Sequence, residues 1–375
     1  MPPIKQPKSL NNKIVDWRPL EYREELFFRY FTWRMKVNDL DHSHYCQVLT
    51  ADMTPAQACW FSFLFGMTYR TPQAYAYWAT FPDFEKMKLK EVIEWNADNW
   101  KRTTYGTDAR YNKGHFAAQF SSIQDWVGSS DLLTKVSDLT QTDDAHINFE
   151  QLFAAIMKLF KYGRMTSWIT CQCLYDTLNL NMDFDNVLIR NPMSDSSMQS
   201  VWNGYCMLKG RYSQLLGDQY AESGYKVSDA DLLSVSKDIM VYREKAQKYS
   251  GVQVDVFKWE SIWCQFKRLF NKKGSKEYPG HSSGDATSRY MYYKENWPEV
   301  DWTPFREALL GNDSIVTGQT YVNDYNKIFG QSGLVLNIHE MFDDMPNAYE
   351  VLGLDPNDNL VHDLFTDHGL ELPSL

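Results

Sequence analysis

The sequence predicts a mainly α-helical, multi-helix globular protein. Apolar residues recur at intervals of three and four along several segments, which is the spacing of one helix face. Helix-capping residues precede several of these segments, and no repeated alternation of strand and helix patterns appears, which argues against a doubly wound sheet. With 375 residues, 43% of them hydrophobic and 23% charged, the chain is long enough to bury one large core or two moderate ones.

Helix start signals place several of these elements. Thr54 and Thr71 are each followed by Pro, so each pair places a capping residue before a proline in the first helical turn. The first of these helices is expected to stop near Gly66, and 148–160 shows a clear amphipathic pattern. Helices are predicted, in chain order, at 21–36, 55–65, 74–80, 148–160, 228–248, 255–270 and 285–295, and only short segments such as 186–189 suit a strand.

The remaining segments predict long polar loops and a coarse domain plan. Loops are expected at 103–114, 137–146, 191–200 and 271–284, and long loops in compact domains are often functional. The plan has an N-terminal extension (1–20), a helical catalytic region (21–335) and an acidic C-terminal tail (336–375). A boundary near 131–146 would divide the catalytic region into two helical lobes.

Charge and cysteine usage limit the class of protein. The net charge of −10 is not that of a protein that coats DNA, because such proteins neutralise phosphates with many basic residues. The charge is polarised, however: 267–276 holds five basic residues and no acid, whereas the chain from 340 onward holds no Lys or Arg. The six scattered cysteines are typical of free thiols in a reducing compartment. With no signal peptide or membrane-spanning run in the sequence, we expect a cytoplasmic protein without a membrane partner.

Aromatic residues make up 15% of the chain, with 13 Trp and 23 Tyr. They favour a core and loops rich in large rings. The alternative is that some rings form a platform on which a base or sugar stacks. No phosphate-binding P-loop, dinucleotide fingerprint, serine nucleophile elbow or zinc protease motif appears in the sequence.

The most informative segment is 256–280. One stripe of the predicted helix is apolar, and Glu260, Cys264 and Lys267 form a second stripe beside it. These residues would line a cleft, or they are an ordinary Glu–Lys surface pair beside a core cysteine. The loop that follows holds Lys272, Lys273 and Tyr278, a combination that suits a phosphate backbone with a base near it.

Two helix breaks place arginines where anions bind well. In 161–168, Gly163 breaks the preceding helix, Thr166 or Ser167 is expected to cap the next one, and Arg164 lies in the break. A plain joint between two helices with a solvated arginine is the alternative. The pair Tyr69–Arg70 lies at a similar break between the helices at 55–65 and 74–80.

The order of several segments resembles a known family. FFRYFTWR, WFSFLFGMTYRTPQA, YGRMTSW, DFDNVLIR, a loop ending in Asn203-Gly204, and WESIWCQFKRLF with a later YPG follow one another here as in the phage amino acid:DNA transferases, also called α-glutamyl/putrescinyl thymine pyrophosphorylases. The resemblance covers about residues 25–297. One departure is MQSVW at 198–202, where relatives are expected to carry a basic stretch that would grip pyrophosphate.

The resemblance implies a fold like that of helical DNA glycosylases and a transferase reaction. The substrate would be double-stranded phage DNA in which 5-hydroxymethyluracil is activated as a pyrophosphate ester, and the amine of an amino acid or polyamine would displace the pyrophosphate. The setting would be the cytoplasm of an infected bacterial host. Alternatives are a DNA glycosylase-like base-processing enzyme and a non-catalytic phage protein that binds DNA or protein.

The residues can be matched to this chemistry. A neutral amine needs a carboxylate base, for which Glu260 is the first candidate, and the leaving group needs cations such as Arg164 and Lys267. Magnesium held by Asp183, Asp185 or Glu260 is an optional cofactor. The predicted catalytic residues are Glu260, Arg164, Lys267 and Asp185. The predicted substrate- and DNA-binding residues are Arg34, Tyr69, Arg70, Ser167, Trp168, Arg190, Asn203, Lys272, Lys273 and Tyr278.

Overall fold

A computed structural model describes residues 20–36, 42–184, 187–188, 199–217, 224–267 and 290–310. Every regular element in these residues is an α-helix or a short 3-10 helix, so the predicted mainly α-helical class is confirmed. Val187 and Leu188, the described part of the suggested strand at 186–189, are not in a strand. Among the described helices, none combines the length and apolar character that crossing a bilayer requires.

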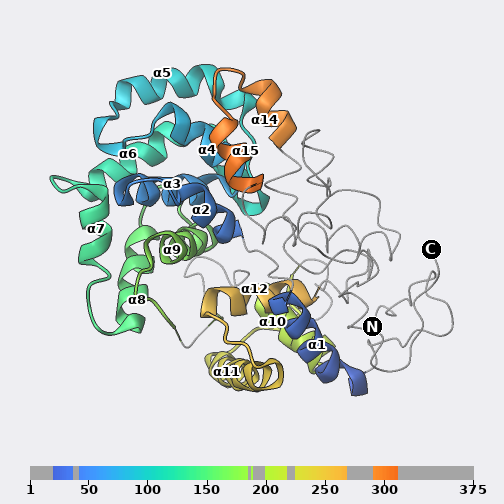
Figure 1. The fold of residues 1–375 in the computed structure, drawn as a ribbon. Helices are drawn as coiled ribbons and strands as arrows, with labels where there is room; N and C mark the ends of the chain where they lie inside the picture. Colours follow the sequence, from blue (N-terminus) through green and yellow to red (C-terminus); the bar gives the residue numbers. More distant parts are fainter. Residues whose placement is uncertain are drawn as a thin grey trace, which may run out of the picture. The chain divides into compact units, whose positions relative to one another are not determined.

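The chain forms two compact units, and each is built from separated stretches of sequence (Figure 1). Unit 1 contains 1–41, 185–284 and 313–375, and unit 2 contains 42–184 and 285–312. The segment 131–146, where a lobe boundary was expected, lies inside unit 2.

The helices of unit 2 are α2 (His42–Thr50), α3 (Pro55–Thr68), α4 (Thr71–Thr80), α5 (Leu89–Asn99), α6 (Phe116–Val127), α7 (Leu132–Asp138), α8 (Ala145–Ile156), α9 (Arg164–Leu178), α14 (Tyr290–Asn296) and α15 (Thr303–Leu310). Short 3-10 helices join them at η2 (Phe84–Lys86), η3 (Trp100–Arg102) and η4 (Thr107–Asn112). Unit 1 holds η1 (Leu20–Tyr22), α1 (Arg23–Lys36), α10 (Gln199–Leu208), η6 (Tyr212–Gln214), α11 (Asp229–Ser250) and α12 (Val256–Phe266).

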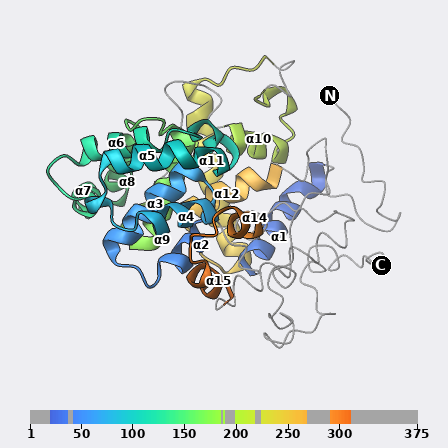
Figure 2. The ribbon, with the colours of Figure 1, turned by 90° about the horizontal axis from the view of Figure 1, so that it is seen from above.

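Helix α3 is the central helix of unit 2. As predicted, Thr54 caps it and Pro55 opens it, and Gln57 completes a reciprocal capping box with Thr54. Every residue from Ala58 to Thr68 is buried. Figures 1 and 2 both show α3 next to α9, its main packing partner.

The two helices pack antiparallel and very closely. Near one end, a side chain on Gly66 would meet the Thr170 hydroxyl and the Thr166 carbonyl oxygen. Towards the other end, the hydroxyls of Ser62 and Thr177 lie 3.0 Å apart. The expected stop near Gly66 is wrong: α3 continues to Thr68, because a glycine at this position serves the close contact with α9 and does not end the helix.

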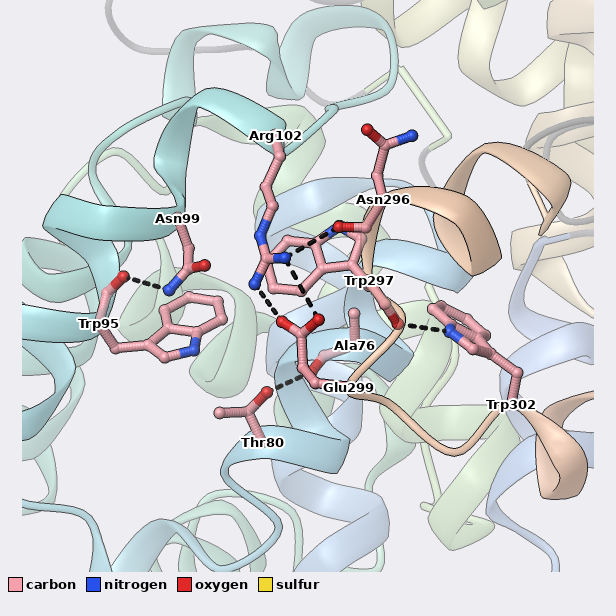
Figure 3. A network of polar contacts seen from close by, with 9 residues as sticks. All are labelled: Ala76, Thr80, Trp95, Asn99, Arg102, Asn296, Trp297, Glu299 and Trp302. Atoms are coloured by element: carbon pink, nitrogen blue, oxygen red, sulfur yellow. Dashed lines mark hydrogen bonds and ion pairs between the residues drawn. The ribbon is translucent and has the colours of Figure 1, made fainter.

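An arginine holds the second stretch of unit 2, within 285–312, against the first stretch, 42–184 (Figure 3). The Arg102 guanidinium lies 3.8 Å from the centre of the Trp297 ring and pairs with the Glu299 carboxylate. It also donates to the Asn296 carbonyl oxygen over 2.9 Å. Trp297 stacks on Trp95 of α5, with ring centres 5.5 Å apart. A charge and two rings therefore hold α14 against the helices at 42–184.

Unit 1 is organised around a ring-rich seam. Of the apolar stripe predicted for the helix at 255–270, Val256, Trp259, Trp263 and Phe266 of α12 are buried, and Phe270 lies outside the described residues. Phe27 of α1 touches three of these rings, with centre-to-centre distances between 4.4 and 5.7 Å. Helix α10 packs so closely on α12 that a side chain on Gly204 would lie 2.5 Å from the Trp263 carbonyl oxygen. Most aromatic side chains among the described residues lie in the core, as the favoured interpretation had it.

Several element boundaries differ from the prediction. Helix α8 begins at Ala145 because Asp144 caps it, and it ends at Ile156, before 160. Helix α9 begins at Arg164 with Gly163 as its N-cap, so Thr166 and Ser167 lie inside the helix and do not cap it. Helices α2, α5, α6, α7, α10 and α15 were not predicted. The predicted loop at 271–284 lies outside the described residues, as do 268–270 and 285–289 of two predicted helices.

Candidate functional site

Two arginines lie at the same end of the α3–α9 pair. Because the two helices are antiparallel, the C-terminus of α3 and the N-terminus of α9 share that end. Arg164 is the first residue of α9, and Arg70 is the N-cap of α4, which follows α3 after Tyr69. The structure therefore brings together the two helix breaks that the sequence showed about a hundred residues apart.

Both helices that begin here have anion-binding character. The first N–H groups of a helix have no partner within it, and the helix dipole places partial positive charge at that end. Neither Arg70 at α4 nor Gly163 at α9 makes a side-chain cap hydrogen bond. Two N-termini without a side-chain cap, one with an arginine as its N-cap and one with an arginine as its first residue, suit the binding of phosphate or carboxylate groups.

Buried polar atoms point to the same conclusion. Among the described residues, Thr71 Oγ1, Gln73 Nε2 and Ser167 Oγ have no hydrogen-bond partner, although each residue is at most 1% exposed. A buried polar atom without a partner costs about 1–3 kcal/mol, so such atoms call for a ligand or a functional reason. We call this group of residues the arginine end: Tyr69, Arg70, Thr71, Gln73, Arg164 and Ser167.

A layer of tyrosines and threonines contacts the side-chain oxygen of Gln73. Its side-chain oxygen accepts hydrogen bonds from the Thr104 N–H over 3.1 Å and from the Tyr293 hydroxyl over 3.0 Å. Burial raises the pKa of Tyr293, while the positive charge of Arg70 acts against this shift. Tyr293 therefore stays protonated and keeps donating at neutral pH. The layer fixes the orientation of Gln73 and directs its amide nitrogen away from the Tyr293 contact.

The backbone at the arginine end is strained. Tyr69 adopts the left-handed region (φ 47°), and so does Lys161 (φ 58°), three residues before Arg164. Neither residue type enters this region readily, and such strain of about 1–3 kcal/mol clusters at functional sites. Gly106 supports Tyr69: its N–H donates to the Thr68 carbonyl oxygen over 2.8 Å, and a side chain there would lie 2.3 Å from the Tyr69 carbonyl oxygen.

In unit 1, the predicted flank of α12 is half-buried beside the core stripe. Glu260, Cys264 and Lys267 are all partly exposed, as expected for residues that border a buried face. The Lys267 ammonium donates to the Ser200 hydroxyl over 2.6 Å, which ties α12 to the start of α10. This contact orients Lys267 along the flank.

Other predicted site residues have packing or clamping contacts. The Asn203 amide binds the backbone N–H and carbonyl of Leu216, each over 2.8 Å, so it holds the η6 turn. Trp168 is 4% exposed and packs its ring on Phe149 and Phe184. The side chain of Arg34 and the whole of Asp185, Arg190, Lys272, Lys273 and Tyr278 lie outside the described residues.

Metal binding stays a prediction. Within the described parts of the chain, no three His, Cys, Asp or Glu side chains come together as a metal-binding group. Of the expected magnesium ligands, Asp183 and Glu260 are described and Asp185 is not.

Thiol reactivity should report on the α12 flank. Burial raises the pKa of Cys46, Cys59 and Cys171 well above the usual value and that of Cys206 to about 12, and Cys173 is also buried. Cys264 alone among the six is half-exposed. Since the exposed thiolate is the reactive form, we expect iodoacetamide at about pH 8 to label one thiol per native chain.

Peptide mapping would locate the label at Cys264, and Cys264→Ser would remove the fast phase. Rapid labelling of several thiols, or a fast phase that persists in Cys264→Ser, would contradict the described burial of the other five.

Comparisons with known proteins converge on one family. A family model described as amino acid:DNA transferase matches residues 35–274, well over half of the chain. A protein named serinyltransferase from Salmonella phage ViI is 22% identical over 261 residues. That match covers 66% of this chain and 62% of the relative, so somewhat under two thirds of the relative's length is represented. No solved structure matches significantly.

Proposed function

Because the chain belongs to the amino acid:DNA transferase family, we propose that it transfers an amino acid onto activated 5-hydroxymethyluracil in double-stranded DNA. The family match favours this reaction over base excision and over a purely non-catalytic role. The setting would be the cytoplasm of an infected bacterium. One observation carries the site assignment: two arginine-headed helix N-termini lie at one end of the α3–α9 pair.

The reaction has two anionic groups to hold, and the arginine end offers two anion sites. The amine nitrogen attacks the methylene carbon on the pyrimidine ring and forms a C–N bond. The C–O bond to pyrophosphate breaks, and pyrophosphate leaves with the bonding electron pair. We assign the pyrophosphate to Arg164 and the N-terminus of α9, where helix N–H groups and a guanidinium stabilise the charge that develops on the leaving oxygen.

The second anionic group is the carboxylate of the amino acid. We assign it to Arg70 and the N-terminus of α4, where Thr71 Oγ1 and Gln73 Nε2 supply buried polar atoms without partners among the described residues. A polyamine has no carboxylate, so this subsite favours an amino acid donor. The amine must lose a proton, so the reaction needs a carboxylate base. Glu260 and Lys267, the base and the second cation predicted from the sequence, belong to unit 1, and their roles stay predictions.

Donor identity is tested by product analysis. DNA bearing 5-(pyrophosphoryloxymethyl)uracil is incubated with the protein and with single donors, then digested to nucleosides for mass measurement. Serine is the first donor to test, since the phage ViI relative is named a serinyltransferase. We expect a nucleoside heavier by one amino acid adduct with serine or another α-amino acid, and little product with serinamide or putrescine. Equal products from serine and serinamide would remove the carboxylate role of Arg70.

A further inference from the structure

Unit 2 has a basic surface that also contains exposed aromatic rings. Trp100 is 38% exposed, Tyr111 63% and Phe160 42%, although most large rings in the described parts of the chain are buried. Between 100 and 115 the chain has four Lys and Arg residues against one acid, Asp108, and between 158 and 164 it has three and no acid. We call this the basic–aromatic surface, and its residues are Trp100, Lys101, Arg110, Tyr111, Lys113, His115, Lys158, Phe160 and Lys161.

Contacts between side chains join most of these residues into one continuous area. The ammonium groups of Lys101 and Lys113 lie 6.0 and 5.9 Å from the Trp100 ring centre. His115 lies two residues after Lys113 in the chain, and its ring centre is 5.8 Å from that of Phe160. The surface therefore runs from the end of α5 to the turn before α9.

A second set of contacts joins Arg110, Tyr111 and Lys161. The Arg110 guanidinium lies 4.9 Å from the Tyr111 ring centre and donates to the Tyr111 hydroxyl over 3.0 Å. The Lys161 ammonium donates to the Tyr111 carbonyl oxygen over 3.0 Å. Lys161 is also the residue held in the left-handed backbone region, so backbone strain is maintained at this surface.

The electrostatic field of this surface is positive. Burial lowers the pKa of His115, and the positive charge of Lys161 lowers it further. Lys101, Arg110, Lys113, Lys158 and Lys161 are exposed. On a chain with a net charge of −10, a locally basic area favours the approach of a polyanion at that place.

We infer that the basic–aromatic surface binds the sugar–phosphate backbone of duplex DNA next to the nucleotide being modified. The choice of DNA rests on the proposed function, whereas the location of the contact rests on the charges and rings of these residues. The ammonium and guanidinium groups pair with phosphates, which position the duplex without reading its sequence. The exposed rings pack against sugars and bases.

Continuity with the reaction site supports this assignment. Lys161 is separated from Arg164 only by Tyr162 and Gly163, and the Tyr162 hydroxyl anchors the turn on the Phe63 carbonyl oxygen of α3 over 3.2 Å. The basic–aromatic surface thus leads directly to the N-terminus of α9. A strand bound along it delivers its activated base to the arginine end.

The test compares two triple variants of equal charge change. Lys101→Gln/Lys113→Gln/Lys158→Gln removes three cations of the surface. Lys86→Gln/Lys88→Gln/Lys90→Gln removes three exposed lysines at the opposite end of α5, roughly 15 Å along the helix, each of which is paired with an acid. Binding of a fluorescent duplex of about 20 base pairs, without pyrophosphate and without donor, is measured by anisotropy over a salt series of roughly 50–200 mM.

The surface variant is expected to bind roughly tenfold or more weakly at about 100 mM salt, with a log–log salt slope lower by about one per lost phosphate contact. The control variant is expected to bind within about twofold of the unmodified chain. Each of its three lysines pairs with a neighbouring carboxylate, so none is expected to contact a phosphate. In transfer assays the surface variant should raise KM for DNA and leave kcat unchanged.

Equal binding of both variants, or equal weakening, would overturn the assignment of the surface. The binding assay needs no chemistry, so a protein that binds DNA through these lysines but yields no adduct would refute the proposed function and leave this surface standing. Adduct formation with no difference between the variants would refute the surface alone.

Discussion

Arg164→Ala is expected to lower kcat for amine transfer by about 100-fold or more, which is the usual effect of removing a group that stabilises developing charge. The loss should appear at saturating DNA and donor, because Arg164 is assigned to the leaving pyrophosphate. The measurement is the initial rate of adduct formation, with circular dichroism to show that the helices are intact.

Two companion variants separate the roles of the arginines. Arg164→Lys keeps the charge but not the two-pronged guanidinium, so a partial loss is expected. Arg70→Ala should instead raise KM for the amino acid, because Arg70 is assigned to the donor carboxylate. If Arg164→Ala retains its kcat, the leaving-group role fails. If Arg70→Ala changes KM for DNA only, the carboxylate role fails.

The second large effect is expected from Gly106→Ala. The added methyl group would lie 2.3 Å from the Tyr69 carbonyl oxygen, and a backbone atom cannot move away as cheaply as the tip of a side chain. Overpacking of this kind costs about 1–3 kcal/mol of unfolding free energy. The forced shift moves Tyr69 and the Arg70 N-cap, so activity should fall about 10- to 100-fold, as is typical of misplacement by about 1 Å.

Gly163→Ala is the matched stability control. Gly163 has an ordinary φ of −76°, and nothing lies within 4 Å of the added methyl group. Its free energy of unfolding, measured in urea, should stay within about 0.5 kcal/mol of that of the unmodified chain. Equal stability of the Gly106 variant and the unmodified chain would mean that the Gly106–Tyr69 contact relaxes freely.

Much of the helical fold could be predicted from local signals. Thr54–Pro55 and the Ser228 cap act within one helical turn, so the sequence shows them directly. Gly66 misled the prediction because its role is a close approach to Thr166 and Thr170, about a hundred residues away. Helices α5 and α6 were missed because no proline or start signal as clear as that of α3 marked them.

The candidate site was predictable to a similar degree. Arg70 and Arg164 could be found because each follows a helix break that is visible in the sequence. Gln73 and Tyr293 were missed, since their hydrogen bond joins residues 220 positions apart and no local pattern indicates it. The basic–aromatic surface was missed for the same reason. Its lysines and rings come from two segments, and in the sequence one looks like a polar loop and the other like the end of a helix.

The most direct measurement of the central claim counts both products of one reaction. DNA bearing 5-(pyrophosphoryloxymethyl)uracil is incubated with isotope-labelled serine, and released pyrophosphate, labelled nucleoside and abasic sites are quantified in the same sample. The account predicts one pyrophosphate released per labelled nucleoside and no abasic sites. Abasic sites with free modified base, or DNA left unchanged with every amino acid tried, would contradict it.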